Sequence, residues 1–291
     1  MSSDPSMHAY LLKYLSTVDS WMSTVLEESL ADALLDIMPP SDGERTARLT
    51  EAFQIRISSH LIHAREDLAR EEYLNDPKRT SFLELYYDTG EYRSASELLS
   101  VVQNRFADFF RCWGDSGEPS ELASMDPLSW RLPPEYRTFP YAGQQISLRP
   151  WIYAVRRRMI KAWTFQFNFS GESGAGSGEN RQSDLPSQVL AAWCARKYPE
   201  FELRVRKIQI TPEGWISRTD RPEPIDEDLI VRSAYEMLET VNHPGGLTAE
   251  LFPRLQTAPV CARCRFRQLC ETQPVPPEEA AAAPSESNGS K

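Results

Sequence analysis

The 291-residue chain lacks long hydrophobic runs and contains only five cysteines. No apolar stretch approaches the roughly 20 residues that a membrane-spanning helix needs. The N-terminus lacks the charged, apolar and small-residue order of a signal peptide. An odd number of cysteines, three of them clustered, is a poor disulfide framework and is more typical of an intracellular metal site. We therefore expect a soluble, cytoplasmic protein with no membrane partner.

Acidic residues are missing from one central window, although the chain carries a net charge of -10 from 32 basic and 42 acidic residues. Residues 136–171 contain no Asp or Glu, and Glu-x-Lys occurs nowhere in the sequence. Asp-x-Lys occurs only at Asp76-Pro77-Lys78, where the proline disfavours a central strand. Magnesium and manganese ions prefer oxygen ligands, above all carboxylates. A strand core in this window is therefore not expected to hold such an ion by its side chains.

Hydrophobic periodicity predicts a mostly helical first part and a mixed second part. The alternation of Trp163, Phe165 and Phe167 with smaller or polar residues predicts a strand within residues 145–169. A further strand is expected over residues 201–210. Apolar residues recurring at three- and four-residue steps predict helices over about 8–38, 44–74, 94–110, 184–198 and 226–241.

Changes in composition divide the chain into five parts. Prolines, serines and glycines accumulate after residue 115, and the last 20 residues are rich in Pro, Ala, Ser and Glu. We expect a helical N-terminal part over 1–115, a loop over 116–144, an α/β core over 145–250, a cysteine segment over 251–271 and a disordered tail over 272–291.

Three cysteines form the most specific motif of the sequence. Cys261, Cys264 and Cys270 make a C-x2-C-x5-C pattern within residues 261–270. Thiolates this close favour joint binding of a metal ion or an iron–sulfur cluster over plain packing in a core. Cys194 lies in an apolar helical stretch and is expected to be a core thiol, whereas Cys112 lies near a helix end and is the better accessory ligand.

Five local sequence patterns, spread from about Tyr10 to Cys270, can be compared with those of a known protein family. They are Trp21 to Glu28, close to W-x-G-x-x-V-H-E; Glu71 to Tyr87; Ala162 to Asn168; Ser187 to Leu190, close to Q-L-x-x-Y; and Phe252-Pro253 before the cysteines with Phe266 between them. In this order they resemble the RecB-type branch of the PD-(D/E)XK nuclease superfamily, which includes CRISPR-associated adaptation exonucleases and the AddB nuclease domain. The resemblance implies an α+β fold with an α/β core, in which helices flank a restriction-endonuclease-like mixed sheet, and a C-terminal cysteine clasp.

The resemblance also implies a metal site whose expected residues are replaced here. The family places a histidine on the first helix, an aspartate on one strand, and an acid and a lysine two residues apart on the next. Glu27, Trp151, Thr164 and Gln166 stand at these four positions. We therefore expect a pseudonuclease that binds neither magnesium nor manganese. In the alternative interpretation, migrated acids such as Glu27 or Glu202 supply the site.

Gln188 matches the glutamine that the family places beside its catalytic face. It is the one candidate remnant of the catalytic set. An ordinary polar residue on a helix surface would produce the same pattern, so both interpretations of Gln188 stay open.

In the family, the three C-terminal cysteines bind a four-iron cluster together with one N-terminal cysteine. Ser6 stands at that fourth position in this chain. The resemblance therefore leaves three outcomes for the clasp. His8, Cys112 or Cys194 completes a 4Fe-4S site, the clasp holds zinc, for which three cysteines and a histidine are well suited, or it binds nothing stably.

Basic residues are concentrated in the acid-free window, at Arg149, Arg156, Arg157, Arg158 and Lys161. Three consecutive arginines are expected in the turn between the first two core strands. Such a cluster suits the phosphate backbone of DNA. A solvated turn, or ion pairs with neighbouring acidic helices, would give the same sequence.

Three hypotheses of function follow. The first is a catalytically inactive nuclease-like protein that binds DNA or a partner nuclease in repair, recombination or defence. The second is an active metal-dependent DNA exonuclease with migrated acids. The third is a helical interaction scaffold that is stabilised by the metal-binding clasp and binds no DNA. Loss of the catalytic set together with retention of the clasp favours the first and the third.

Overall fold

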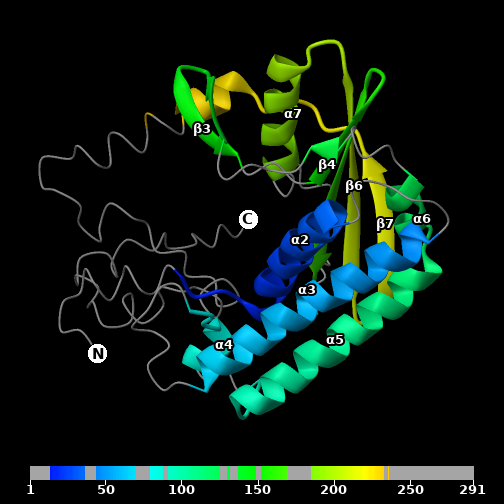
Figure 1. The fold of residues 1–291 in the computed structure, drawn as a ribbon. Coiled ribbons are helices and arrows are strands. Elements are labelled where there is room, and N and C mark those ends of the chain that lie inside the picture. The colour runs from blue at the N-terminus through cyan, green and yellow to red at the C-terminus, as the bar shows by residue number, and fades with distance from the viewer. Residues whose placement is uncertain are drawn as a thin grey trace, which may run out of the picture.

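The computed structural model describes residues 14–36, 44–69, 79–87, 91–124, 130–131, 137–148, 152–169, 185–232 and 235. Its first part is helical and its second part contains the strands (Figure 1). The helices are α2 (Val18–Asp36), α3 (Arg45–Leu68), α4 (Leu83–Tyr86), α5 (Ala95–Asp115), α6 (Glu118–Ser124) and α7 (Leu185–Lys197). The strands are β1 (Trp130–Arg131), β2 (Arg137–Tyr141), β3 (Gln144–Leu148), β4 (Ile152–Arg156), β5 (Met159–Phe167), β6 (Glu202–Thr211) and β7 (Gly214–Asp220).

Helices are confirmed within the predicted ranges 8–38, 44–74, 94–110 and 184–198, where α2, α3, α5 and α7 lie, although residues 14–17 precede the start of α2. The helix predicted over 226–241 lies partly outside the described residues. The start of α5 follows from local chemistry, because the Ser94 hydroxyl accepts a hydrogen bond from the Glu97 N–H at 3.1 Å and satisfies a donor of the first turn. None of the described helices is both long and apolar enough to cross a bilayer.

The described strands form a mixed sheet in the order β1-β4-β5-β6-β7, with β2 and β3 in a separate two-stranded ribbon. The β5–β6 pair is parallel, and the other pairs are antiparallel. Parallel neighbours need a crossover connection, and α7 lies within the connection from β5 to β6. The expected α+β architecture, with a mixed sheet and a helical first part, is confirmed.

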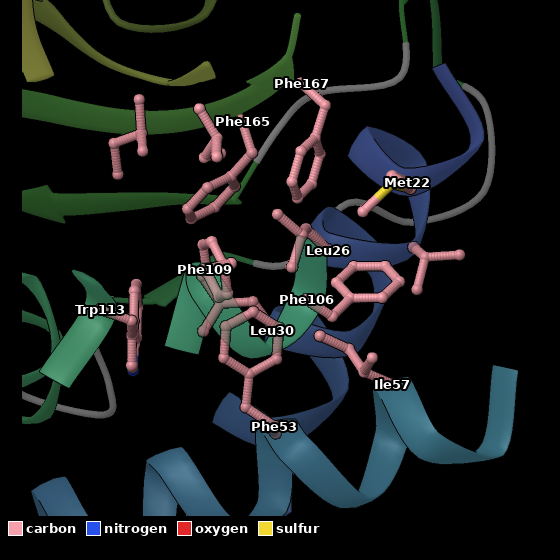
Figure 2. Close-up of a cluster of buried hydrophobic side chains, with 14 of the residues drawn as sticks. Met22, Leu26, Leu30, Phe53, Ile57, Phe106, Phe109, Trp113, Phe165 and Phe167 are labelled. Atoms are coloured by element: carbon pink, nitrogen blue, oxygen red, sulfur yellow. The ribbon is translucent and has the colours of Figure 1, made fainter. Parts of the chain in front are cut away.

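The larger core lies between one face of the sheet and the helices α2, α3 and α5. The alternation predicted for β5 is confirmed, because Phe165 and Phe167 point into this core together with Trp163. Figure 2 shows the two phenylalanines opposite Met22 and Leu26 of α2. Burying each such side chain stabilises the fold by about 1.5–3 kcal/mol, so this core accounts for a large share of the stability.

The smaller core lies on the opposite face of the sheet, beneath α7. Ile160 and Ala162 of β5 meet Leu190 and Trp193 of α7 there. Tyr153 of β4 packs edge-on against Trp193, with 5.5 Å between the ring centroids. The sheet therefore has helices on both faces, and consecutive residues of β5 contribute to different cores.

The prediction of a loop over residues 116–144 is wrong where the structure has helix or strand. This stretch contains α6, β1 and β2. Its prolines are compatible with these elements: Pro119 lies in the first turn of α6, where a missing N–H costs nothing. Pro140 lies opposite Gln145 in the β2–β3 ribbon, at a position outside the hydrogen-bonded pairs, which tolerates proline at a sheet edge.

Candidate functional site

Two of the four residues that the sequence resemblance places at catalytic positions meet in the structure. The Thr164 hydroxyl donates a hydrogen bond of 2.9 Å to Glu27 Oε1. The same carboxylate oxygen accepts a second hydrogen bond from the Phe165 N–H at 3.3 Å. Thr164 is only 5% exposed, so the contact is shielded from water. The Glu27 carboxylate is thus engaged by protein donors.

This contact belongs to a regular series between α2 and the edge of β5. The Phe167 N–H donates to Ser23 Oγ at 3.0 Å, and the Phe169 N–H donates to Asp19 Oδ2 at 2.9 Å. Four residues of helix rise about 6 Å, and two residues of strand rise about 6.6 Å. The near match lets every fourth side chain of α2 meet every second N–H of the strand.

The series runs along the edge of β5 past its last described pair with β4. Among the described residues, the β4–β5 pairing reaches Ile152 and Trp163, whereas β6 pairs with β5 as far as Phe167. Beyond Trp163, the N–H groups of Phe165, Phe167 and Phe169 face α2, and buried backbone donors must be satisfied. Side chains of α2 satisfy them, and we name Asp19, Ser23 and Glu27 with their strand partners the α2–β5 seam.

Asp19 connects the seam to a third helix. Its Oδ1 accepts from Arg105 of α5 at 3.0 Å, with both side chains less than one-fifth exposed. The Arg105 guanidinium also lies over the Phe169 ring, 4.2 Å from the centroid. The end of the β5 segment is therefore fixed by α2 and α5 together.

The other residues that the sequence resemblance singled out lie apart from the Glu27–Thr164 contact. Gln166 is exposed on the same strand face as Thr164. Gln188 is half-buried on α7. Its backbone carbonyl accepts a hydrogen bond of 3.2 Å from the Ile225 N–H. That bond connects α7 to the chain that follows β7. Trp151 lies outside the described residues.

The metal-binding prediction for the cysteine clasp lies largely outside the described residues. Cys261, Cys264, Cys270 and His8 are not described. Cys112 is half-buried on α5. Cys194 is buried, and desolvation raises the pKa of its thiol to about 12, which fits the expected core thiol. Among the described residues, no group of three or more His, Cys, Asp or Glu side chains is arranged to hold a metal ion.

The expected basic cluster is divided by the structure. Arg156, Arg157 and Arg158 are exposed at the turn between β4 and β5, as predicted. Lys161, which we expected to contact DNA together with these arginines, instead binds within the protein. Its ammonium forms an ion pair with Glu121 and lies 5.0 Å from the centroid of the Trp163 ring. The Lys161 side chain is only 15% exposed, so it is committed to the fold. Arg149 lies outside the described residues.

A buried carboxylate near Lys161 was not predicted from the sequence. Glu118 of α6 is 2% exposed and accepts from Trp163 Nε1 at 3.2 Å and from the Arg206 guanidinium at 2.6 Å. The indole of a buried tryptophan needs such an acceptor. The sequence shows that need but not which acid meets it, because Glu118 and Trp163 are 45 residues apart.

Comparisons with known proteins identify no family for this chain. No family model and no curated protein matches it. Among solved structures, it is similar to one described as the crystal structure of SSO0001, with 15% sequence identity over 84% of this chain and 95% of that chain. The TM-score of that match is 0.33, a level at which the similarity supports no conclusion about fold family or activity.

Proposed function

We propose that the protein is a PD-(D/E)XK nuclease-like protein without hydrolytic activity, which binds DNA or a partner nuclease. The observation that carries the proposal is the Glu27–Thr164 hydrogen bond of 2.9 Å. Hydrolysis by a metal-bound water needs an ion held by several anionic oxygens. At this position one carboxylate is occupied by a hydroxyl and a backbone N–H.

The neighbouring residues support the same conclusion. Thr164 and Gln166 offer neutral oxygens where the family has an acid and a lysine. On β6, Lys207 lies beside Thr164 in register but forms an ion pair with Asp220 at 3.0 Å. This lysine is therefore already neutralised by a carboxylate, and it does not replace the lysine that would stabilise charge in a phosphodiester transition state.

The clasp of Cys261, Cys264 and Cys270 is proposed to stabilise the fold by holding a 4Fe-4S cluster or zinc. Three soft thiolate donors suit either group and do not suit magnesium or manganese. The role proposed for it is structural, since a metal that joins distant parts of a chain contributes its binding free energy to folding.

The central test measures DNA binding and cleavage by the full chain across a salt titration, with manganese or magnesium present. We expect binding that weakens as salt rises, because phosphate contacts release counterions, and no cleavage with either ion. The same preparation is analysed for iron and zinc, with one metal expected in stoichiometric amount.

Cleavage that is abolished by Glu27→Gln would overturn the proposal in favour of an active exonuclease with migrated acids. If the protein neither binds nor cleaves DNA, the result would favour binding to a partner protein. The observation that supports a partner is a pair of exposed isoleucines seven residues apart on α3: Ile55 is 61% exposed and Ile62 is 54% exposed.

A further inference from the structure

The tip of the β4–β5 hairpin lies far from the replaced catalytic positions. Met159, the first residue of β5 after the turn, precedes Thr164 by five residues on the same strand, which corresponds to about 16 Å at 3.3 Å per residue. Figure 1 shows this turn at the top of the sheet, whereas the seam with α2 lies lower along β5. The arginines of the turn therefore form a surface separate from the Glu27–Thr164 contact.

The backbone at the tip is unusual for the residue that it carries. Arg156 pairs with Met159, so Arg157 and Arg158 form a two-residue turn. Arg157 has a φ of 56°, in the left-handed region where a side chain clashes and where hairpin turns favour Gly, Asn or Asp. The chain thus has an arginine at a position whose geometry favours glycine, and strained residues of this kind are concentrated at functional sites.

The other turn of the same kind provides a comparison within the molecule. Tyr141 pairs with Gln144 in the β2–β3 ribbon, so Ala142 and Gly143 form its two-residue turn. Their φ values are 50° and 75°. This turn uses small residues and carries no charge, which shows that the chain can build a tight hairpin without arginines.

The arginines at the tip also differ from other basic residues of the sheet in their partners. Lys161, Arg204, Arg206 and Lys207 each form an ion pair with an acidic side chain. Arg156 and Arg157 form no ion pair with any other described residue, and both are exposed. Arg158 lies 3.6 Å from Glu200, with both side chains more than 70% exposed, a contact that water and salt weaken.

We propose that Arg156, Arg157 and Arg158 form a docking site for the phosphate backbone of duplex DNA. The inference rests on the proposed function and specifies which surface binds and what chemistry it recognises. Guanidinium groups bind phosphate oxygens through paired hydrogen bonds. All three side chains are exposed at the tip, so their guanidinium groups are accessible to a ligand.

The charge at the tip favours DNA over an acidic protein as the partner. Arg156, Arg157 and Arg158 are adjacent and exposed, and duplex DNA carries about one phosphate charge per 1.7 Å of its axis. Neighbouring guanidinium groups therefore meet phosphates on any duplex, whereas a protein would need a matching cluster of acidic side chains. Binding of an acidic protein is one outcome of the test.

The decisive variant is Arg157→Gly, because it removes the charge and relieves the left-handed strain at once. We expect an unchanged or higher melting temperature. Binding of a fluorescein-labelled duplex is expected to weaken, and the slope of log Kd against log salt to fall by about one, the value for one lost phosphate contact. A purely structural role for Arg157 predicts no change in that slope.

Two control variants separate strain from charge. Ala142→Gly relieves the same kind of strain in the β2–β3 turn and leaves the charge unaltered, so DNA binding should not change. Arg93→Gln removes an exposed positive charge just before α5, and the salt slope should stay at the wild-type value. A fall in slope with Arg93→Gln equal to that with Arg157→Gly would overturn the specific role of the tip.

The remaining outcomes distinguish the inference from the proposed function. If the wild type does not bind the duplex at any salt concentration, DNA binding as such is wrong. If the wild type binds and Arg157→Gly and Arg156→Gln/Arg158→Gln bind equally well, only the docking site is wrong. If a polyglutamate peptide displaces the duplex at equal charge concentration, the tip binds an acidic protein, and the inference about DNA is overturned.

Discussion

At the residue scale, Glu84 is an acid placed where burial works against its charge. It lies on α4, and its Oε1 accepts a hydrogen bond of 2.9 Å from the Val18 N–H at the start of α2. Desolvation by burial raises the pKa of this carboxyl, opposed by backbone hydrogen bonds that favour the charged form. Its Oε2 is buried without a hydrogen-bond partner among the described residues.

A raised pKa in the folded state makes stability depend on pH in a defined direction. The native protein holds the Glu84 proton more tightly than the unfolded chain does. The stability that this proton contributes is therefore complete below the unfolded pKa and is lost as pH rises through the folded pKa. Glu84→Gln is therefore expected to become progressively more stable relative to the wild type as pH increases from about 4 to 7. Thermal melts at several pH values measure this difference.

Glu51→Gln, at an exposed position of α3, is the matched control for Glu84→Gln, because it removes a carboxyl that is not buried. A constant difference for Glu84→Gln would contradict the assignment of the burial effect to this carboxyl.

Single residues also show where sequence reasoning succeeds and where it stops. The alternation of Trp163, Phe165 and Phe167 predicts a strand whose aromatic side chains share one face, because a strand has a period of two. The pairing of Lys161 with Glu121 is not contained in any local pattern, since the two residues are 40 apart. A run of basic residues is visible in the sequence, but the partners that neutralise some of them are set by tertiary structure.

At the scale of elements, the α2–β5 seam is the feature whose energetics are most accessible to experiment. Ser23 accepts from the Phe167 N–H at 3.0 Å and donates to the Asp19 carbonyl at 2.8 Å. Ser23→Ala leaves the strand N–H without this acceptor in a partly buried place. We expect a loss of about 1–2 kcal/mol in the free energy of unfolding, measured by urea denaturation.

Thr24→Ala, at the next position of α2, provides the control for Ser23→Ala. The Thr24 hydroxyl donates to the Ser20 carbonyl at 3.1 Å on the exposed side of the helix and serves no strand. Its removal should change stability by less than about 0.5 kcal/mol. Equal losses for the two variants would mean that the seam contributes nothing specific.

The seam also illustrates the limits of predicting how elements meet. Asp19, Ser23 and Glu27 recur at four-residue steps, so a polar stripe on α2 is visible in the sequence. Which N–H groups this stripe meets depends on how α2 packs along β5, which no local propensity fixes. Composition and periodicity do not reveal that Glu27 lies beside Thr164, because the two residues are 137 positions apart.

At the scale of the whole molecule, the class of fold was predictable because each local signal agrees with it. Amphipathic helices of the first part and alternating strands of the second lead to an α+β arrangement with one mixed sheet. The stretch over 116–144 was mispredicted because its prolines were interpreted as loop signals. Pro119 and Pro140 occupy the few positions in helices and ribbons that tolerate proline.

The seam has a further consequence, for the solubility of the molecule rather than for its function. The segment from Ala162 to Phe169 contains no charged residue and no proline, and alternates aromatic with small or polar side chains, a composition typical of segments that assemble into amyloid-like fibrils. Without α2, its edge would be the kind of template on which further chains can add. Because α2 covers that edge, it blocks the addition of further strands and so opposes aggregation. We expect variants that loosen α2 to form insoluble material well before they lose their helical content.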